Sequence, residues 1–239
     1  MFDNFQILEW DSEFFGFKVG RIDHNFLERG RDNGSIQRLL DEDVKLCYCF
    51  SDSPLDVSLF SKEFDVLLVD EKIPLVKRLD RQAVTHPKVS LYTKRAPEEN
   101  LIKLAIRAGE QSRFMADPRI PKYKVEELFK IWIEKSVKKE LATDVLVYRE
   151  NTEIIGFLII QIKADKPYAS LMAVQAEYEG KGIAFALMRT GEEILTSRGY
   201  SHVWSATQMS NRKALLIYNR HGLEQQDPVY VYHIWKKRR

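Results

Sequence analysis

The chain has 239 residues, of which 44% are hydrophobic and 11% aromatic, enough apolar side chain for one large or two small packed domains. That composition excludes disorder as a description of the whole chain. Lys and Arg number 37 against 35 Asp and Glu, a net charge of +2, so we expect no nucleic acid and no membrane among its partners.

Location and redox chemistry follow from short segments. Met1–Asn4 is not a basic segment leading into an apolar one, and no apolar run approaches the roughly 20 residues of a membrane span, so we expect a cytoplasmic protein. Cys47 and Cys49 would share one face of a strand, which is poor geometry for a bridge. The five histidines have no ligand spacing, and we expect no metal site.

Residues 1–95 are expected to form a small α+β domain. Turn residues at Ala96–Asn100 mark its end. Apolar periodicity predicts strands at Phe5–Trp10, Lys18–Ile22, Val44–Phe50, Phe64–Asp70 and Lys88–Lys94, with short helices at Ser35–Asp43 and Leu55–Lys62.

Residues 96–239 are expected to form a second domain with a mixed α/β sheet and helices on both of its faces. Two amphipathic helices come first, one ending near Gly109 and one around Val125–Ile133. The remaining expected elements are a hairpin of Asp144–Arg149 and Ile154–Ile162, a strand at Ala169–Val174, a helix at Ile183–Arg198, a strand at His202–Thr207, a helix from Asn211 to Asn219, and a strand at Val229–Trp235.

A glycine-containing loop joins the strand Ala169–Val174 to the helix that begins at Ile183. The first turn of a helix has unpaired N–H groups and a partial positive charge. Glycines let an anion approach the backbone without a Cβ in the way. This layout favours a ligand that carries a pyrophosphate, and an ordinary turn at a helix start is the alternative interpretation.

The element order and this loop resemble the GNAT (GCN5-related) N-acetyltransferase superfamily, whose motif is Gln/Arg-x-x-Gly-x-Gly/Ala. The matching residues here are Glu179–Ala184, with Glu179 in place of Gln or Arg. This departure removes the usual side chain at the first position, while the N–H donors belong to the backbone. The resemblance implies a GNAT acyltransferase fold preceded by a smaller α+β domain, with acetyl-CoA as co-substrate.

Four further segments resemble the dTDP-fucosamine acetyltransferases of enterobacterial common antigen biosynthesis. They are Trp10–Gly16, Gln111–Phe114, Trp132–Glu134 and Ala206–Asn211. The resemblance implies acetylation of the 4-amino group of a dTDP-4-amino-4,6-dideoxyhexose, and a nucleotide-sugar substrate as the small-molecule partner. It also allows a homodimer.

The superfamily resemblance assigns residues to the co-substrate. Ala173 and Val174 would offer backbone hydrogen bonds to pantetheine where their strand separates from its neighbour. Asn211 would contact the same molecule, although an N-cap role is the compatible alternative. The remaining N–H donors, for the pyrophosphate, would be Gly180, Lys181, Gly182, Ile183 and Ala184, and a solvated Lys181 side chain is the alternative for that residue.

Catalytic roles follow in the same way. Tyr218 lies two helical turns after Asn211 on the same face, and would protonate the thiolate as it leaves. The Val174 N–H would polarise the thioester carbonyl. A half-buried core position is the alternative for Tyr218. Glu134 is a weak candidate for a general base, and a surface or ion-paired glutamate is the favoured interpretation.

The acceptor site of such enzymes lies between the first two helices, which points to Ser112, Arg113 and Phe114. The planar guanidinium of Arg113 suits a pyrophosphate, and a loop brace with Asp117 is the alternative. Phe15 is a further candidate for lining the cleft, with a core position as its alternative.

Other functions stay open. A GNAT enzyme for another amine would act on a different amino sugar nucleotide, a polyamine, an antibiotic or a protein N-terminus. A non-catalytic module that binds acyl-CoA is the third hypothesis, which the presence of the glycine loop and Tyr218 disfavours.

Overall fold

The computed structural model describes residues 5–23, 35–60, 62–79 and 85–237. The chain divides into two compact units: unit 1 comprises Met1–Lys72 and Asp227–Arg239, and unit 2 comprises Ile73–Gln226. The expected boundary near residue 95 differs from this division, because a C-terminal strand joins unit 1 and residues 73–95 join unit 2. The segment Met1–Asn4 and the last two residues of the chain lie outside the described part.

In its described residues, unit 1 is a sheet with two short helices and one 3₁₀ helix. Its strand order is β1, β2, β3, β11 and the first part of β4, with β2 and β3 parallel and the other pairs antiparallel. Its core includes Cys47 and Cys49, two buried thiols with no bridge between them. The elements are β1 (Phe5–Ile7), α1 (Glu9–Phe15), β2 (Val19–Asp23), α2 (Ser35–Asp41), β3 (Leu46–Ser51), η2 (Val57–Phe60), β4 (Phe64–Arg78) and β11 (Val229–Lys236).

The beginning of the chain differs from the expected single strand. β1 ends at Ile7 and α1 follows, ended by Gly16 in the left-handed region at φ 75°. The Ser12 hydroxyl donates to the Leu8 carbonyl and accepts from the Val19 N–H, which fixes α1 against the start of β2. The expected strand was wrong beyond Ile7, because a short apolar run has the same pattern in a strand and in a helical turn.

Unit 2 has a mixed sheet in the order β4, β9, β8, β7, β6, β5, and β10 also pairs with β4. β8 and β9 are parallel, and the hairpins β6–β7 and β7–β8 are antiparallel. The elements are β5 (Val89–Leu91), α3 (Glu99–Ala108), η3 (Gly109–Gln111), α4 (Arg113–Ala116), α5 (Lys122–Val137), β6 (Asp144–Glu150), β7 (Glu153–Lys163), β8 (Lys166–Val174), η4 (Ala176–Tyr178), α6 (Ile183–Ser197), β9 (His202–Gln208), α7 (Arg212–Arg220) and β10 (Glu224–Gln225).

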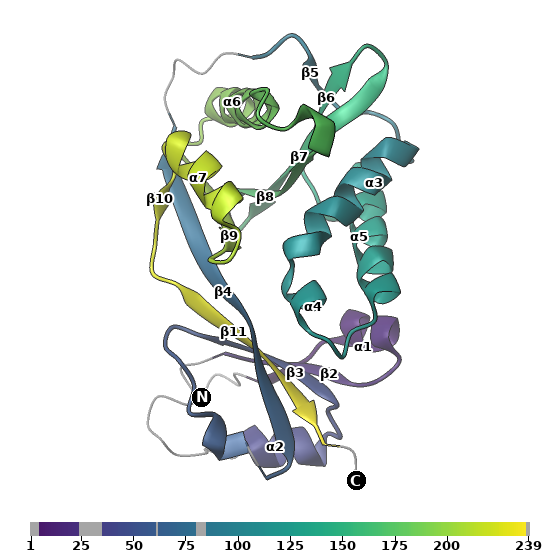
Figure 1. The fold of residues 1–239 in the computed structure, drawn as a ribbon, viewed down its shortest axis with the longest axis vertical. Coiled ribbons are helices and arrows are strands. Elements are labelled where there is room, and N and C mark those ends of the chain that lie inside the picture. Colours follow the sequence, from purple (N-terminus) through teal and green to yellow (C-terminus); the bar gives the residue numbers. More distant parts are fainter. Residues whose placement is uncertain (1–4, 24–34, 61, 80–84, 238–239) are drawn as a thin grey trace. The chain divides into compact units, whose positions relative to one another are not determined.

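Helices cover both faces of this sheet, as the sequence predicted. α3 and α5 lie side by side and pack on one face, where Val145 and Phe157 join their core (Figure 1). α6 packs on the other face against Leu146 and Leu158, the next residues along the same strands. This alternation is the period-2 pattern of a strand buried on both sides. α7 lies next to α6 and contributes Leu215 and Tyr218 to a further cluster that includes Met188.

Gly109 lets α3 and α5 approach each other closely. A Cβ there would lie 2.4 Å from Cδ2 of Phe129 on α5. The backbone at Gly109 is right-handed, with φ −76°, so glycine is needed for space and not for a left-handed turn. Among the helices in the described part of the chain, none combines the length and the apolar composition that crossing a bilayer requires.

Candidate active site

The site begins where β8 separates from β9. In the β7–β8 register Ile160 faces Ala169 and Ile159 faces Leu171, so Ser170 is an extra residue, a β-bulge. The parallel pairing of β8 with β9 ends at Ala169 opposite Ser205. A bulge bends its strand, and here the bend opens a cleft between the C-terminal halves of β8 and β9.

Strand alternation decides which backbone groups face this opening. The Gln175 N–H donates to the Ile155 carbonyl of β7 at 2.8 Å. In an antiparallel pair, alternate residues direct both polar groups to the same neighbour. The main-chain N–H and C=O of Ala173 therefore point to β7. The main-chain N–H and C=O of Met172 and Val174 point to the open edge of β8. The Val174 carbonyl accepts from Arg107 Nε at 3.2 Å on that side, which agrees with this geometry.

The glycine loop follows β8 and η4. Gly180 and Gly182 have φ of 76° and 79°, the left-handed region that favours glycine, and a Cβ at either would meet open space. Gly182 is the N-cap of α6 and has no side chain to cap it. The first N–H groups of α6, from Ile183 onward, have no acceptor within the helix and lie at the cleft. The Lys181 N–H is directed to the Tyr178 carbonyl at 3.4 Å.

The opposite wall is α7. Asn211 is its N-cap, and the Asn211 side chain accepts from the Ala214 N–H at 3.1 Å. Tyr218 follows two turns later and is buried where β8 and β9 part, close to Ser205. The Ser205 hydroxyl donates to the Ala169 carbonyl at 2.8 Å. Burial raises the pKa of Tyr218, and its hydrogen bond with Ser205 opposes that rise in part.

Together these elements enclose a cleft of about 770 Å³, within unit 2 and within the usual size range of small-molecule sites. Cations line it at Arg107, Arg212, Lys213 and Arg220. Val174, Tyr218 and Asn211 all line it, as do the loop residues Gly180, Gly182, Ile183 and Ala184. The segments that form the walls are Arg107–Ala108, Glu110–Gln111, Ser170–Val174, Tyr178–Gly180, Gly182–Phe185, Ala206–Gln208, Ser210–Ala214, Ile217–Tyr218 and Arg220.

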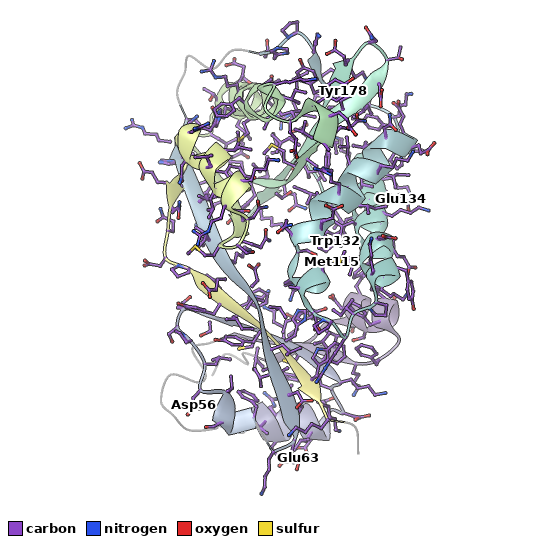
Figure 2. All side chains as sticks on the ribbon, viewed as in Figure 1. Asp56, Glu63, Met115, Trp132, Glu134 and Tyr178 are labelled. Carbon is purple, nitrogen blue, oxygen red and sulfur yellow. The ribbon has the colours of Figure 1, made fainter. Side chains whose placement is uncertain are left out.

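Other predicted residues lie elsewhere. Lys181 does not line the cleft, and its ammonium lies 4.6 Å from the centroid of the Tyr178 ring. Glu134 lies on α5 and does not line the cleft (Figure 2). Phe15 is in unit 1, where it packs edge-to-face on Phe14.

The segment between α3 and α5 supplies different residues from those expected for an acceptor. Ser112 is the N-cap of α4, and Phe114 is buried edge-to-face with Trp132. Arg113 places its guanidinium 4.4 Å from the Phe114 ring centroid. These three residues do not line the cleft, whereas the preceding Glu110 and Gln111 do. Acceptor roles for Ser112, Arg113 and Phe114 stay predictions.

The sequence analysis missed several cleft residues. Arg107, Met172 and Lys213 had no local signal, because their place depends on pairing and on helix packing far along the chain. Glu110 had only its position next to the expected acceptor segment. Within the described residues, no group of His, Cys, Asp or Glu side chains is gathered in the manner of metal ligands.

Comparison with known proteins finds a family that part of the chain resembles. Residues 109–223 match the model of the acetyltransferase (GNAT) family, and they contain most of the cleft. This segment, slightly less than half of the chain, is therefore similar to the GNAT acetyltransferases. The fold is also that of a GCN5-related N-acetyltransferase from Sphaerobacter thermophilus, with TM-score 0.57 and 16% identity over 97% of this chain and 76% of that one.

Two curated relatives resemble parts of the chain. The spore coat polysaccharide biosynthesis protein SpsD of Bacillus subtilis is 31% identical over 137 residues, 57% of this chain and 47% of that protein. N-alpha-acetyltransferase 30 of Schizosaccharomyces pombe is 28% identical over 90 residues, 36% of this chain and 60% of that protein. The matches thus span about half the length of these relatives.

Proposed function

We propose that this protein transfers the acetyl group of acetyl-CoA to the amine of a nucleotide-linked amino sugar. Our first candidate is the 4-amino group of dTDP-4-amino-4,6-dideoxygalactose. The observation that carries the reaction class is the cleft in which the open edge of β8, the glycine loop and Tyr218 meet. A pantetheine chain suits the open edge of a strand, and a pyrophosphate suits the start of a helix.

The chemistry assigned to the chain is acid assistance and positioning. The neutral amine attacks the thioester carbon, and the Val174 N–H donates to the oxygen that becomes negative. When the carbon–sulfur bond breaks, the Tyr218 hydroxyl gives its proton to the sulfur. Water takes the proton that the amine loses. The walls of the cleft hold the two reactants in line, which lowers the entropic barrier.

Three observations support a sugar acceptor. The match to a spore coat polysaccharide biosynthesis protein covers 57% of this chain. Its own segments Gln111–Phe114 and Ala206–Asn211 resemble acetyltransferases for dTDP-amino sugars. Glu110 and Gln111 at the cleft wall provide hydrogen-bonding groups for such an acceptor.

A second candidate acceptor is a protein N-terminus, favoured by the match to N-alpha-acetyltransferase 30. A peptide acceptor would lie extended along the cleft and present its α-amine to the thioester. The same residues would perform the chemistry, so the acceptor alone separates the two candidates.

The test is a thiol-release assay with acetyl-CoA and a panel of amines. The panel contains dTDP-4-amino-4,6-dideoxygalactose, its 4-epimer, the 3-amino isomer, spermidine and peptides with free N-termini. Rapid turnover of one dTDP sugar supports the proposal and identifies the amine. Turnover of peptides alone contradicts the sugar acceptor. Binding of CoA without turnover of any amine favours a non-catalytic module.

A further inference from the structure

An ion cluster in the wall of the cleft consists of Arg107, Glu179 and Lys213. Glu179 Oε1 accepts from Arg107 Nη2 at 2.9 Å, and Oε2 pairs with the Lys213 ammonium. Arg107 also donates from Nε to the Val174 carbonyl at 3.2 Å. All three side chains line the cleft, so this one carboxylate serves two cations beside the glycine loop.

The cluster joins opposite walls of the cleft. Arg107 comes from α3, Glu179 from the turn after η4, and Lys213 from the first turn of α7. The Glu179 carboxylate thus bridges the β8 side and the α7 side. Hydrogen bonds from Lys213 and Arg107 lower the pKa of Glu179 despite its partial burial, which keeps the carboxylate ionised at neutral pH.

The position of the cluster makes the Glu179 carboxylate and a bound phosphate alternative partners of the same cations. Gly180 follows Glu179 directly, and a pyrophosphate at the start of α6 would lie next to the same two cations. A phosphate oxygen and a carboxylate oxygen are alternative acceptors for one ammonium group. Lys213 is 64% exposed and has a long flexible stem, so it can change partners, whereas Arg107 is tied to the Val174 carbonyl as well.

We propose that Glu179 is an internal competitor for the phosphates of acetyl-CoA: it holds Lys213 in the free protein and releases it to a phosphate on binding. Its contact with Arg107 persists and keeps the Val174 end of β8 in place. This inference rests on the proposed function for the identity of the ligand. Glu179 then influences the affinity for acetyl-CoA. It occupies the first position of the loop motif, where the GNAT motif has Gln or Arg.

The proposal predicts the direction in which each substitution changes the Kd of CoA. Glu179→Gln keeps the shape of the side chain and removes the competing charge, so we expect the Kd of CoA to fall. Lys213→Met removes the recruited cation, so we expect the Kd to rise. An exposed ion pair corresponds to about a two- to fivefold effect. The Lys213 exchange should cost more affinity in the Glu179→Gln background, where no carboxylate competes for the ammonium.

The experiment is a double-mutant cycle measured by calorimetry with CoA, which binds without turnover. It uses the full chain and compares wild type, both single variants and the double variant at low and high salt. Glu177→Gln is the matched control, since Glu177 is an exposed carboxylate two residues away that does not line the cleft. Thermal melts report whether each variant is folded. If Glu179→Gln does not fold, Lys213→Met alone still tests whether the Kd of CoA rises when the recruited cation is removed.

A lower Kd for Glu179→Gln with a larger Lys213 effect in that background supports the proposal. A higher Kd for Glu179→Gln, or a Lys213 effect that is equal in both backgrounds, overturns it. Either result leaves the reaction class standing. If wild type does not bind CoA at all, the proposed function fails instead, and the two failures are thereby distinguished.

Discussion

Tyr218 combines burial with a position at the point where β8 and β9 separate. Its hydroxyl is next to Ser205, which itself donates to the Ala169 carbonyl. We expect Tyr218→Phe to lower kcat by about 100-fold, because proton transfer to the thiolate is lost, with little change in CoA affinity. Steady-state kinetics and calorimetry with CoA measure both. Tyr200→Phe is the control, since Tyr200 packs against the α6 side of the sheet and does not line the cleft.

The pH profile tests the raised pKa of Tyr218. Burial raises the pKa of Tyr218 above its ordinary 10.0, so the proton-donating form persists to higher pH than for a solvated tyrosine. We expect no fall in kcat from this group below about pH 10. A falling limb near neutral pH that disappears in Tyr218→Phe contradicts the raised pKa of Tyr218.

Glu192 lies in a buried ion cluster behind Tyr218. It accepts from Lys77 Nζ at 2.7 Å and lies 2.9 Å from His221 Nε2, with 8% of its side chain exposed. We expect Glu192→Ala to lower the free energy of unfolding by about 3–5 kcal/mol, because the Lys77 charge is left without its partner. Urea denaturation measures this. The neighbouring Glu193→Ala is the control, and an equal loss there contradicts a specific role for the cluster.

The same carboxylate predicts a pH dependence of stability. Burial alone would raise the pKa of Glu192, but the hydrogen bonds with His221 and Lys77 dominate and lower it below 4.5. A carboxyl whose pKa is lower in the folded protein stabilises the fold at pH values above its unfolded pKa. This stabilisation is lost as the pH falls through the pKa of the folded state. Wild type should therefore lose more stability than Glu192→Gln on acidification below pH 4.5.

At the scale of elements, the packing of α3 on α5 depends on Gly109. A Cβ would lie 2.4 Å from the Phe129 ring, and an aromatic ring in a packed core yields little. We expect Gly109→Ala to cost about 1–3 kcal/mol by overpacking. Chemical denaturation measures the loss, and a second exchange, Phe129→Leu, should recover part of it. A Gly109→Ala variant as stable as wild type contradicts the close approach.

The elements of the site differ in how well the sequence predicts them. The glycine loop, the helix after it and the N-cap Asn211 were predicted, because each depends on residues within one or two turns. The bulge at Ser170 was not, because it exists only in the register of β8 against β7. The sequence therefore predicted that β8 separates from its neighbour only through the family resemblance. Arg107 was not predicted either, because its contacts are with residues far along the chain.

At the scale of the whole molecule, the chain does not divide where turn residues suggested. Ala96–Asn100 has turn chemistry, yet β5 before it pairs with β6 after it in unit 2. β4 was expected to end at Asp70 and instead continues to Arg78 through Pro74. β11, the last strand, pairs with β3 and β4 in unit 1. Local patterns predict that such strands exist, but not which partners they take.

The central position of β11 predicts that unit 1 depends on the C-terminal strand. Ile234 is fully buried in a core that also holds Ile22, Leu39 and Phe64, all of unit 1. We expect Ile234→Ala to cost about 2–5 kcal/mol, the usual loss for a large cavity in a packed core. Native-state hydrogen exchange should show the loss in β2, β3 and β11. The amides of β6 and β7 belong to other hydrophobic clusters and should keep their wild-type protection.

Leu146→Ala supplies the matched comparison, because Leu146 is equally buried in a core of unit 2. It should reduce protection in β6 and β7 and leave β2 and β3 unchanged. Each core then stabilises its own strands, and CoA binding should survive Ile234→Ala at temperatures where unit 1 has lost protection. If either exchange lowers protection equally in both units, the two cores unfold as one cooperative structure, and unit 2 depends on β11 as much as unit 1 does.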